Sequence, residues 1–292
     1  MNASPFLARL KEGGVLVSDG ATGTNLQKRG LPRGVAGELW VLEEPEEILR
    51  LHRDFIEAGA DIVLTCTFGG TSVRLEHAGL AGRAEEINRK AVELARQAAE
   101  GTSTLVAASI GPTGQLLKPY GPLEEEAAVA SFAAQAKTLA EAGADLLVIE
   151  TQFDLGEAEA AIKGVRSVST LPLVCSFSFD RGVRTMMGVR PAQAARQLEA
   201  LGVDVVGINC GRSLDENLNA LKEIKTATAL PVWFKPNAGL PRLDDDGCPV
   251  YDVTPENMGF YASDWVAAGA NVVGGCCGTS PEHLQQIAKA VK

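Results

Sequence analysis

The chain has 292 residues and a formal net charge of −10, with 37 acidic side chains against 27 Lys and Arg. Binding to nucleic acid or to an anionic membrane surface calls for a basic face, so this balance argues against both partners. No apolar run approaches the roughly 18 residues of a membrane span. Residues 1–10 lack the charged start and apolar core of a signal peptide, so we predict a cytoplasmic protein.

Short apolar runs alternate with longer segments of helical period along the whole chain. The runs predict eight strands, at residues 15–19, 62–68, 105–111, 146–150, 173–179, 205–210, 232–237 and 272–276. The segments between and after them predict eight helices, at residues 45–58, 84–99, 124–142, 157–168, 191–200, 214–227, 255–268 and 281–291. Several of these helices begin with proline in the first turn, where its missing N–H costs nothing.

A degenerate repeat marks the junctions from helix to strand, at residues 57–61, 141–145, 201–204 and 268–271. In each copy a helix end is followed by a glycine that suits a left-handed cap, and then by a polar residue that opens a buried strand. The chain thus holds eight predicted units of one strand and one helix, with no low-complexity linker or shift in composition between them. This regularity favours a closed α/β fold over an open doubly wound sheet. We predict a single-domain (β/α)8 TIM barrel over residues 1–292.

In such barrels the active site lies at the C-terminal ends of the strands. Polar residues gather at these predicted ends: Asp19 to Gly23, Thr67-Phe68, Gly111 to Gly114, Glu150-Thr151, Asp180, Asn209-Cys210, Lys235 to Asn237 and Cys276-Cys277. The barrel therefore brings Cys210 close to the adjacent pair Cys276-Cys277, although 66 residues separate Cys210 from Cys276 in the chain.

Three thiols at one place predict a zinc site. Zinc held by Cys210, Cys276 and Cys277 keeps one position open, as in catalytic rather than structural sites. A substrate thiol suits the open position, because metal coordination supplies thiolate at neutral pH. The side chain of Asn237 or Asn209 suits it when substrate is absent. Because adjacent residues of a strand point to opposite faces, the pair serves one metal only if the strand breaks its pleat there, which the flanking glycines permit.

The three thiols have two other interpretations, as buried core residues or as a redox pair. Buried core cysteines are common, but three of them at strand ends among glycines are unlike core filling. A redox pair is disfavoured, because adjacent cysteines form a strained ring and the chain has no Cys-x-x-Cys motif. Cys66 and Cys175 lie inside apolar strands and are predicted to be core residues, and Cys248 receives no role.

Glu150 ends an apolar strand, where a buried carboxylate requires a cation. We predict that it binds a substrate ammonium group, with a structural ion pair to a loop arginine as the alternative. The turn at residues 19–23 has backbone N–H groups suited to a carboxylate or phosphate. His52, His77 and His283 fall on helices, which favours structural or surface roles and leaves no base for a serine triad. Asp244 to Asp246 are interpreted as a solvated loop.

Together these motifs resemble the zinc-dependent homocysteine S-methyltransferase family. The resemblance rests on Asp19 to Thr24, Leu51 to Phe55, Thr67-Phe68, Ile149 to Thr151, Asn209 to Gly211, Pro236 to Pro241 and Gly274 to Thr279, and so covers essentially the whole chain. Within the family, the last two strings look most like the homocysteine-binding module of cobalamin-dependent methionine synthase, and less like the betaine-dependent enzyme.

The resemblance implies that Cys210, Cys276 and Cys277 bind zinc, and that Asn237 exchanges with the sulfur of the substrate. It also implies that Asp19, Gly20, Ala21, Glu150 and Asn209 surround the amino acid end of homocysteine, and we add Thr22 and Phe68 to these substrate-binding residues. The reaction implied is attack by homocysteine thiolate on a methyl group to form methionine.

The methyl donor stays open at this point. A separate methylcobalamin protein, a corrinoid or folate methyl-donor partner, is one hypothesis, and the few aromatic residues near the mouth favour it slightly over a methyl-onium donor that needs an aromatic cage. Small donors are the alternative: S-methylmethionine, S-adenosylmethionine or betaine. A zinc and thiol-binding module of a multi-protein complex, and a barrel enzyme that acts on another thiol or selenol, are further alternatives.

Overall fold

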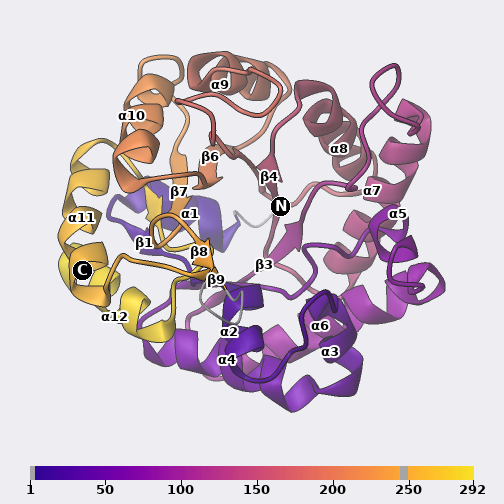
Figure 1. Cartoon of the computed structure of the whole chain (residues 1–292), viewed down its shortest axis with the longest axis horizontal. Coiled ribbons are helices and arrows are strands. Elements are labelled where there is room, and N and C mark those ends of the chain that lie inside the picture. Colours follow the sequence, from indigo (N-terminus) through magenta and orange to yellow (C-terminus); the bar gives the residue numbers. More distant parts are fainter. Residues whose placement is uncertain (1–3, 244–248) are drawn as a thin grey trace.

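A computed structural model describes residues 4–243 and 249–292. Eight parallel strands form one sheet in the order β1-β10-β7-β6-β5-β4-β3-β2. A bridge between Ser18 and Ile62 joins the two outer strands of this order, so the sheet closes on itself with helices around it (Figure 1). The predicted (β/α)8 TIM barrel is confirmed.

The barrel strands start where the sequence predicts, within one residue, but several end earlier. They are β1 Leu16–Val17, β2 Ile62–Leu64, β3 Leu105–Ile110, β4 Leu146–Gln152, β5 Leu173–Phe177, β6 Val205–Cys210, β7 Val232–Pro236 and β10 Val272–Val273. The predictions 62–68 and 272–276 are too long. After β2 the chain turns, with the Thr67 N–H donating to the Thr65 carbonyl, and it leaves the ladder to line the mouth.

All eight predicted helices form, with bounds within two residues of the predictions. They are α4 Pro45–Glu57, α6 Ala84–Ala99, α7 Glu125–Glu141, α8 Leu155–Val168, α9 Pro191–Ala200, α10 Leu214–Lys225, α11 Pro255–Ala267 and α12 Pro281–Val291. The chain also forms short elements that were not predicted: α1 Pro5–Glu12, α2 Thr22–Lys28, α3 Gly37–Glu43, α5 Ser72–Glu76, the 3-10 turn Ala81–Arg83, and the hairpin of β8 Arg242–Leu243 and β9 Pro249–Val250.

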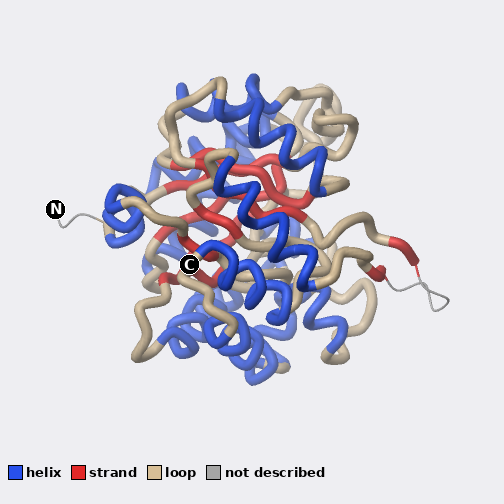
Figure 2. Tube along the Cα trace, turned by 90° about the vertical axis from the view of Figure 1, so that its left-hand side faces the viewer, coloured by secondary structure: helices blue, strands red, loops and turns tan. Residues whose placement is uncertain are grey.

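Helix α1 closes the N-terminal end of the barrel. Its Phe6 is fully buried and packs with the apolar side chains that fill this end, among them Leu16, Ile62 and Trp233. In Figure 2 this end lies on the left beside the N-terminus, and the β8–β9 hairpin projects from the opposite end. A plugged N-terminal end leaves the C-terminal end of the strands as the place for a substrate cavity.

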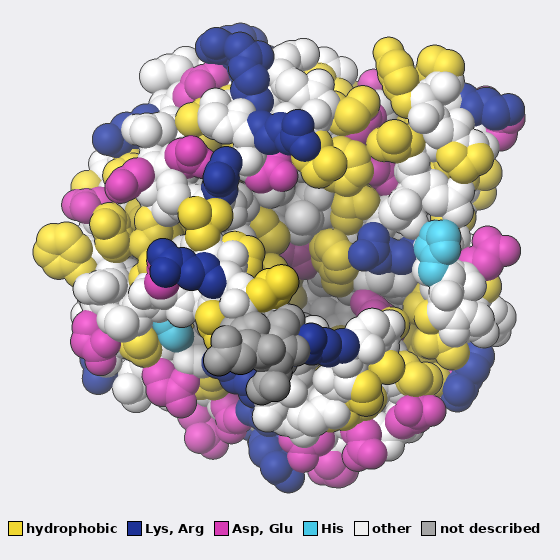
Figure 3. Space-filling model, in the orientation of Figure 1, with side chains coloured by type: hydrophobic (Ala, Val, Ile, Leu, Met, Phe, Trp, Pro, Cys, Tyr) yellow, Lys and Arg dark blue, Asp and Glu magenta, His cyan; other side chains and the backbone are white. Residues whose placement is uncertain are grey.

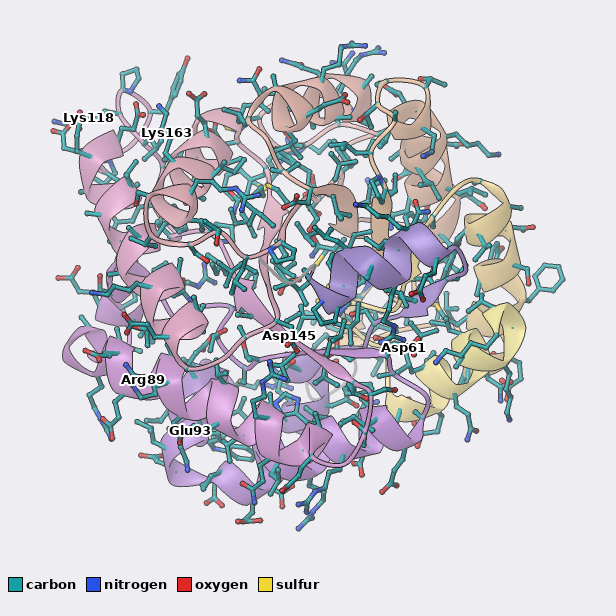
Figure 4. The ribbon with its side chains drawn as sticks, turned by 180° about the vertical axis from the view of Figure 1, so that it is seen from behind. Asp61, Arg89, Glu93, Lys118, Asp145 and Lys163 are labelled. Carbon is teal, nitrogen blue, oxygen red and sulfur yellow. The ribbon has the colours of Figure 1, made fainter. Side chains whose placement is uncertain are left out.

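The repeat found in the sequence has a structural role at this closed end. Asp61, Asp145 and Asp204 each accept a hydrogen bond from the first backbone N–H groups of a neighbouring strand, at Val17, Val106 and Leu173, and Asn271 does the same for Val232. All three aspartates also form ion pairs with basic side chains: Asp61 with Arg9 and Lys292, Asp145 with Arg96, and Asp204 with Arg166. Figure 4 shows Asp61 and Asp145 on this face. The repeated polar residue therefore serves the scaffold.

The opposite face carries the mouth, which Figure 3 shows as a hollow near the middle of the molecule. The β8–β9 hairpin lies beside it and exposes Leu243 and Val250. Asp244 to Asp246 and Cys248 lie outside the described residues. Within the described ranges no helix is long and apolar enough to cross a membrane.

Candidate active site

A cavity of about 550 Å³ opens at the C-terminal ends of the strands. Every barrel strand except β5 supplies residues to its wall, either from its own end or from the loop that follows. The predicted residues on the wall are Gly20, Ala21, Thr22, Phe68, Glu150, Cys210, Cys276 and Cys277. Asp19, Asn209 and Asn237 do not line the cavity but lie directly behind its wall, as their contacts show.

The three predicted thiols meet on this wall. Cys210 ends β6 and Cys276-Cys277 follow β10, yet their Sγ atoms all lie within 4.8 Å of one another. The Sγ atoms of Cys210 and Cys276 are 3.0 Å apart. Hydrogen bonds from Cys210 and Cys276 lower the pKa of Cys277, while hydrogen bonds with Cys276 and Cys277 raise the pKa of Cys210. Among the described residues this is the one cluster of Cys, His or acidic side chains that suits a metal ion.

The backbone at Cys210 is held in an unusual conformation. Its φ is +58°, in the left-handed region that residues with a Cβ rarely adopt. The Cys210 carbonyl accepts hydrogen bonds from the Asn217 side chain, at 2.7 Å, and from the Asn237 backbone N–H, at 3.2 Å. These two donors stabilise the strained residue, and the strain turns its thiol toward the pair from β10. Such local strain is typical of functional sites.

The adjacent cysteines lie in a turn and not on a strand. β10 ends at Val273, so the strand is interrupted before the pair and the predicted strand 272–276 is too long. The Cys276 N–H donates to the Pro236 carbonyl and the Cys277 carbonyl accepts from the Ala238 N–H, at 2.8 and 2.9 Å. These bonds fasten the turn to the end of β7, so both thiols face the same cavity.

Asn237, whose backbone N–H donates to the Cys210 carbonyl, has an unsatisfied side-chain oxygen. Its side-chain N–H donates to the Gly211 carbonyl at 2.8 Å, whereas its Oδ1 is buried without a hydrogen-bond partner. An orphaned buried amide oxygen is costly unless something outside the protein binds it. Three thiols and one unpartnered oxygen form a donor set that fits zinc, which takes sulfur and oxygen ligands in fourfold coordination.

A buried charge network lies under the cavity. The Lys235 Nζ donates to Asp19 Oδ1 at 2.6 Å, and both side chains are almost fully buried. Asp19 Oδ2 accepts from the Leu64 N–H at 2.7 Å. Because each charge has a partner, the pair avoids the penalty of an isolated buried ion. Asp19 therefore does not line the cavity itself but holds the side chain of Lys235, which does.

Glu150 faces the cavity from the end of β4. Burial raises the pKa of its carboxyl to about 7, with the Lys235 ammonium and a hydrogen bond from the Ser109 hydroxyl opposing that rise. Among the ion pairs of residues 4–243 and 249–292 none joins Glu150 to an arginine, and the cation that acts on Glu150 is Lys235, which pairs with Asp19. A buried carboxyl with a raised pKa favours a cationic ligand, since a cation would restore its charged form.

Asn209 is fully buried and every polar atom of its side chain has a partner. Its Oδ1 accepts from the Thr151 N–H at 2.8 Å and from the Ser176 hydroxyl at 2.7 Å. Its Nδ2 donates to the Thr151 hydroxyl and approaches the sulfurs of Cys210 and Cys276, at 3.6 and 3.8 Å. Asn209 therefore contacts the thiol cluster from behind.

The predicted anion-binding turn opens α2, whose first turn has no side-chain cap. The Ala21 N–H is already bonded to Thr279, at 3.1 Å to Oγ1 and 3.2 Å to the carbonyl oxygen. Thr22 and Gly23, the next two residues of this turn, line the cavity. The turn thus keeps donors suited to a carboxylate.

Two aromatic side chains line the cavity. Phe68 was predicted, and the Arg74 guanidinium lies over its ring at 5.2 Å. Tyr251, from the loop after β9, was missed, because nothing in its local sequence shows that it folds back over the cysteines. Two aromatics on this wall, one of them covered by Arg74, do not form an aromatic cage.

Lys235 was placed at the mouth without a role in the site, and Ser109 was not predicted there. Lys235 lies in the otherwise apolar run of β7, and a lysine in a buried strand is a signal that could have identified it. Ser109 left no comparable signal. Outside the site, His77 is exposed, His283 accepts from the N-cap of α12, and His52 is buried, which lowers its pKa to about 4. Cys175 is a core residue, and Cys66 is buried with one side on the cavity.

Comparison with known families identifies this barrel. Residues 16–291 match the family described as homocysteine S-methyltransferase. The chain belongs to this family. The match confirms the resemblance drawn from the sequence and the methyltransferase class that it implies.

Two members of the family share the barrel within much longer chains. They are methionine synthases of Mycobacterium leprae and Mycobacterium tuberculosis, each 32% identical over 294 residues that cover 95% of this chain. The chain spans about a quarter, 24%, of their length.

A solved family structure has the same extent as this chain. The metallated form of the homocysteine methyltransferase MmuM from Escherichia coli is 28% identical, with a TM-score of 0.83 over 98% of this chain and 99% of that one. The apo form of MmuM superposes with a TM-score of 0.76. A dehydroquinate dehydratase from Geobacillus kaustophilus, 12% identical with a TM-score of 0.52, shares the barrel fold alone.

Proposed function

We propose that this protein is a zinc-dependent homocysteine S-methyltransferase that forms methionine. The observation that carries the proposal is the convergence of Cys210, Cys276 and Cys277 beside the unpartnered oxygen of Asn237. The cavity, the three thiols and the Glu150 carboxyl lie together at the mouth of a barrel of this family. The carboxyl suits a substrate ammonium group. The metallated form of MmuM supports a metal at this site.

In this proposal Cys210, Cys276 and Cys277 hold the zinc, and Asn237 Oδ1 is the ligand that the sulfur of the substrate replaces. When bound, zinc lowers the pKa of a thiol and so supplies thiolate at neutral pH. The protein adds position: the strained backbone of Cys210 and the fastened turn at Cys276-Cys277 fix the cluster before substrate arrives.

The amino acid end of homocysteine is held by other residues of the cavity wall. Glu150 accepts the ammonium group, and the turn that Gly20, Ala21 and Thr22 form on the cavity wall receives the carboxylate, with the Thr22 N–H as a donor because the Ala21 N–H is bonded to Thr279. Asp19 and Asn209 act from behind the wall, the first through Lys235 and the second through Thr151 and the sulfurs. These contacts orient the thiol toward the cysteine cluster.

For the methyl donor we propose a separate methylcobalamin protein. The cavity opens to solvent at the mouth and lacks an aromatic cage, whereas a methyl-onium donor would need one. The mycobacterial methionine synthases carry this barrel as a quarter of their chains, which fits a barrel that receives its methyl group from another module.

A small donor, such as S-methylmethionine, S-adenosylmethionine or betaine, is the second candidate. The specific observation in its favour is that MmuM, a homocysteine methyltransferase, is covered to 99% by this chain. A barrel of this extent therefore suffices for the activity that the name of MmuM states.

Incubation of the zinc-loaded protein with homocysteine and one donor at a time tests the function and separates the donors. We expect methionine with a methylcobalamin-loaded corrinoid protein and none with the three small donors. Methionine from a small donor would instead establish the second candidate. No methionine from any donor, with zinc bound, would contradict the proposed activity and favour a zinc and thiol-binding module, or an enzyme acting on another thiol or selenol. Protein inactivated with a chelator is the control.

A further inference from the structure

Homocysteine carries two opposite charges at its amino acid end, an ammonium group and a carboxylate. Glu150 suits the ammonium group, whereas the turn at residues 20–22 offers the carboxylate backbone donors alone. Burial of an anion is costly unless hydrogen bonds and an opposite charge compensate it. The carboxylate of the substrate therefore calls for a cation on the cavity wall.

Lys235 is the one basic side chain among the described residues that line the cavity. It lies deep in the wall, with 3% of its side chain exposed. The ring of Trp233, two residues earlier on β7, has its centre 5.8 Å from the Lys235 Nζ, and the face of an aromatic ring attracts a cation. Together with Asp19, this ring holds the ammonium group in one place before any ligand binds.

The Lys235 ammonium group keeps donors that no protein group uses. A lysine ammonium carries three N–H groups. Within the described residues Nζ forms a single hydrogen bond, to Asp19 Oδ1 at 2.6 Å. Asp19 is itself anchored, because its Oδ2 accepts from the Leu64 N–H at 2.7 Å. The remaining N–H groups of Lys235 are therefore available to an anion in the cavity that this side chain lines.

Lys235 also lies beside the turn that is expected to receive the carboxylate. Asp19, which binds the ammonium group, is followed directly by Gly20, Ala21 and Thr22 on the cavity wall. Because the Ala21 N–H is bonded to Thr279, the turn has few backbone donors to offer, and a carboxylate has two oxygens to satisfy.

A chain of hydrogen bonds connects this position to Glu150. Leu64 donates to Asp19, and the next residue, Thr65, accepts from the Ser109 N–H at 3.2 Å. The Ser109 hydroxyl in turn donates to Glu150. The wall thus presents a carboxyl and an ammonium group on one connected framework, and an α-amino acid carries the complementary charges on one carbon atom.

We propose that Lys235 binds the carboxylate of the substrate and so restricts the methyl acceptor to thiols that are α-amino acids. Its Nζ donates to one carboxylate oxygen, while the turn at residues 20–22 donates to the other. A site built to hydrogen-bond a polar group rejects an analogue that lacks the group, because the buried donors are then left without a partner. This inference rests on the proposed homocysteine methyltransferase function.

Three thiols separate the two charges of the substrate: homocysteine, 3-aminopropane-1-thiol, which lacks the carboxylate, and 4-sulfanylbutanoic acid, which lacks the ammonium group. Their dissociation constants with the zinc-loaded protein are measured by isothermal titration calorimetry. Homocysteine should bind about thirtyfold more tightly than 3-aminopropane-1-thiol, the size expected for a hydrogen bond to a charged group. Equal affinity of these two thiols for the unaltered protein would overturn the inference.

Asp19→Asn and the double variant Asp19→Asn, Lys235→Met form a matched pair that differs in the lysine alone. Asparagine keeps the shape of Asp19 and still accepts from the Leu64 N–H, and the double variant leaves neither Asp19 nor Lys235 as an unpaired buried charge. Relative to Asp19→Asn, the double variant should bind homocysteine and 4-sulfanylbutanoic acid about thirtyfold more weakly. Its binding of 3-aminopropane-1-thiol should change little.

Equal weakening of all three thiols in the double variant would overturn the inference, because it would show that Lys235 merely holds the wall in place. Unchanged binding of homocysteine would overturn it as well. Zinc content and homocysteine binding of the unaltered protein are measured first. Unaltered protein that binds no zinc or no homocysteine contradicts the proposed function together with this inference. Protein that binds both, with affinities that do not depend on the carboxylate, contradicts this inference alone.

Discussion

Cys210→Ala is expected to lose its bound zinc and its methyl transfer to homocysteine. The substitution removes one of the three clustered thiols, whose Sγ lies 3.0 Å from the Sγ of Cys276, and leaves two. Zinc binding by thiolate and imidazole ligands is worth about 10–16 kcal/mol, so loss of one ligand in three should reduce activity by at least about a thousandfold. Zinc per chain, measured by elemental analysis, and the rate of methionine formation check this result.

Cys175→Ala is the control for that experiment. Cys175 is a fully buried cysteine on β5 and does not line the cavity, so its removal should cost some stability and leave zinc content unchanged. Retention of one zinc ion per chain and of normal activity in Cys210→Ala would show that the cluster is not the metal site.

Glu150→Gln is expected to lower kcat/KM for homocysteine by roughly two orders of magnitude, because loss of one partner of a buried charge pair costs about 2–5 kcal/mol. Glutamine has the same shape and still accepts from the Ser109 hydroxyl, so the change removes charge with little effect on packing. The effect should appear mainly as a higher KM. Steady-state kinetics of the two proteins check it.

The pH dependence gives the same carboxyl a second signature. Its pKa in the free protein is raised by burial to about 7, and the ionised form is the one that binds an ammonium group. Below pH 7 the carboxyl is protonated, so kcat/KM should fall as the pH drops from 8 to 6. Glu150→Gln should lose that component and keep the part that comes from the thiol of the substrate. Parallel pH profiles in both proteins would rule out the assigned role.

Much of this site could be predicted from single segments of the sequence. Apolar runs of strand length with polar ends indicate a parallel barrel, and the rule that strand ends meet at one mouth then places Cys210 beside Cys276 and Cys277. The carboxyl of Glu150 was predicted in the same way, because a charged residue at the end of a buried strand needs a partner. These inferences depend on strand periodicity alone.

Features that depend on long-range contacts were beyond such reasoning. The pairing of Lys235 with Asp19 joins β7 to β1 across the barrel, and the contact of Tyr251 with Gly278 joins two loops. β10 ends at Val273, so the strand is longer in the sequence prediction than in the fold, although the Cys276 N–H still donates to the Pro236 carbonyl of β7. The short helices α2 and α3 lack the length for a clear periodic pattern.

We propose that three cysteines hold zinc with one exchangeable position. X-ray absorption at the zinc edge, recorded on the protein with and without homocysteine, reports the ligands of the metal and so checks this claim. We predict three sulfur ligands and one oxygen ligand without homocysteine, and four sulfur ligands at saturation, with the oxygen of Asn237 displaced. A spectrum that does not change when homocysteine saturates the protein, or a protein that binds no stoichiometric zinc, would contradict the claim.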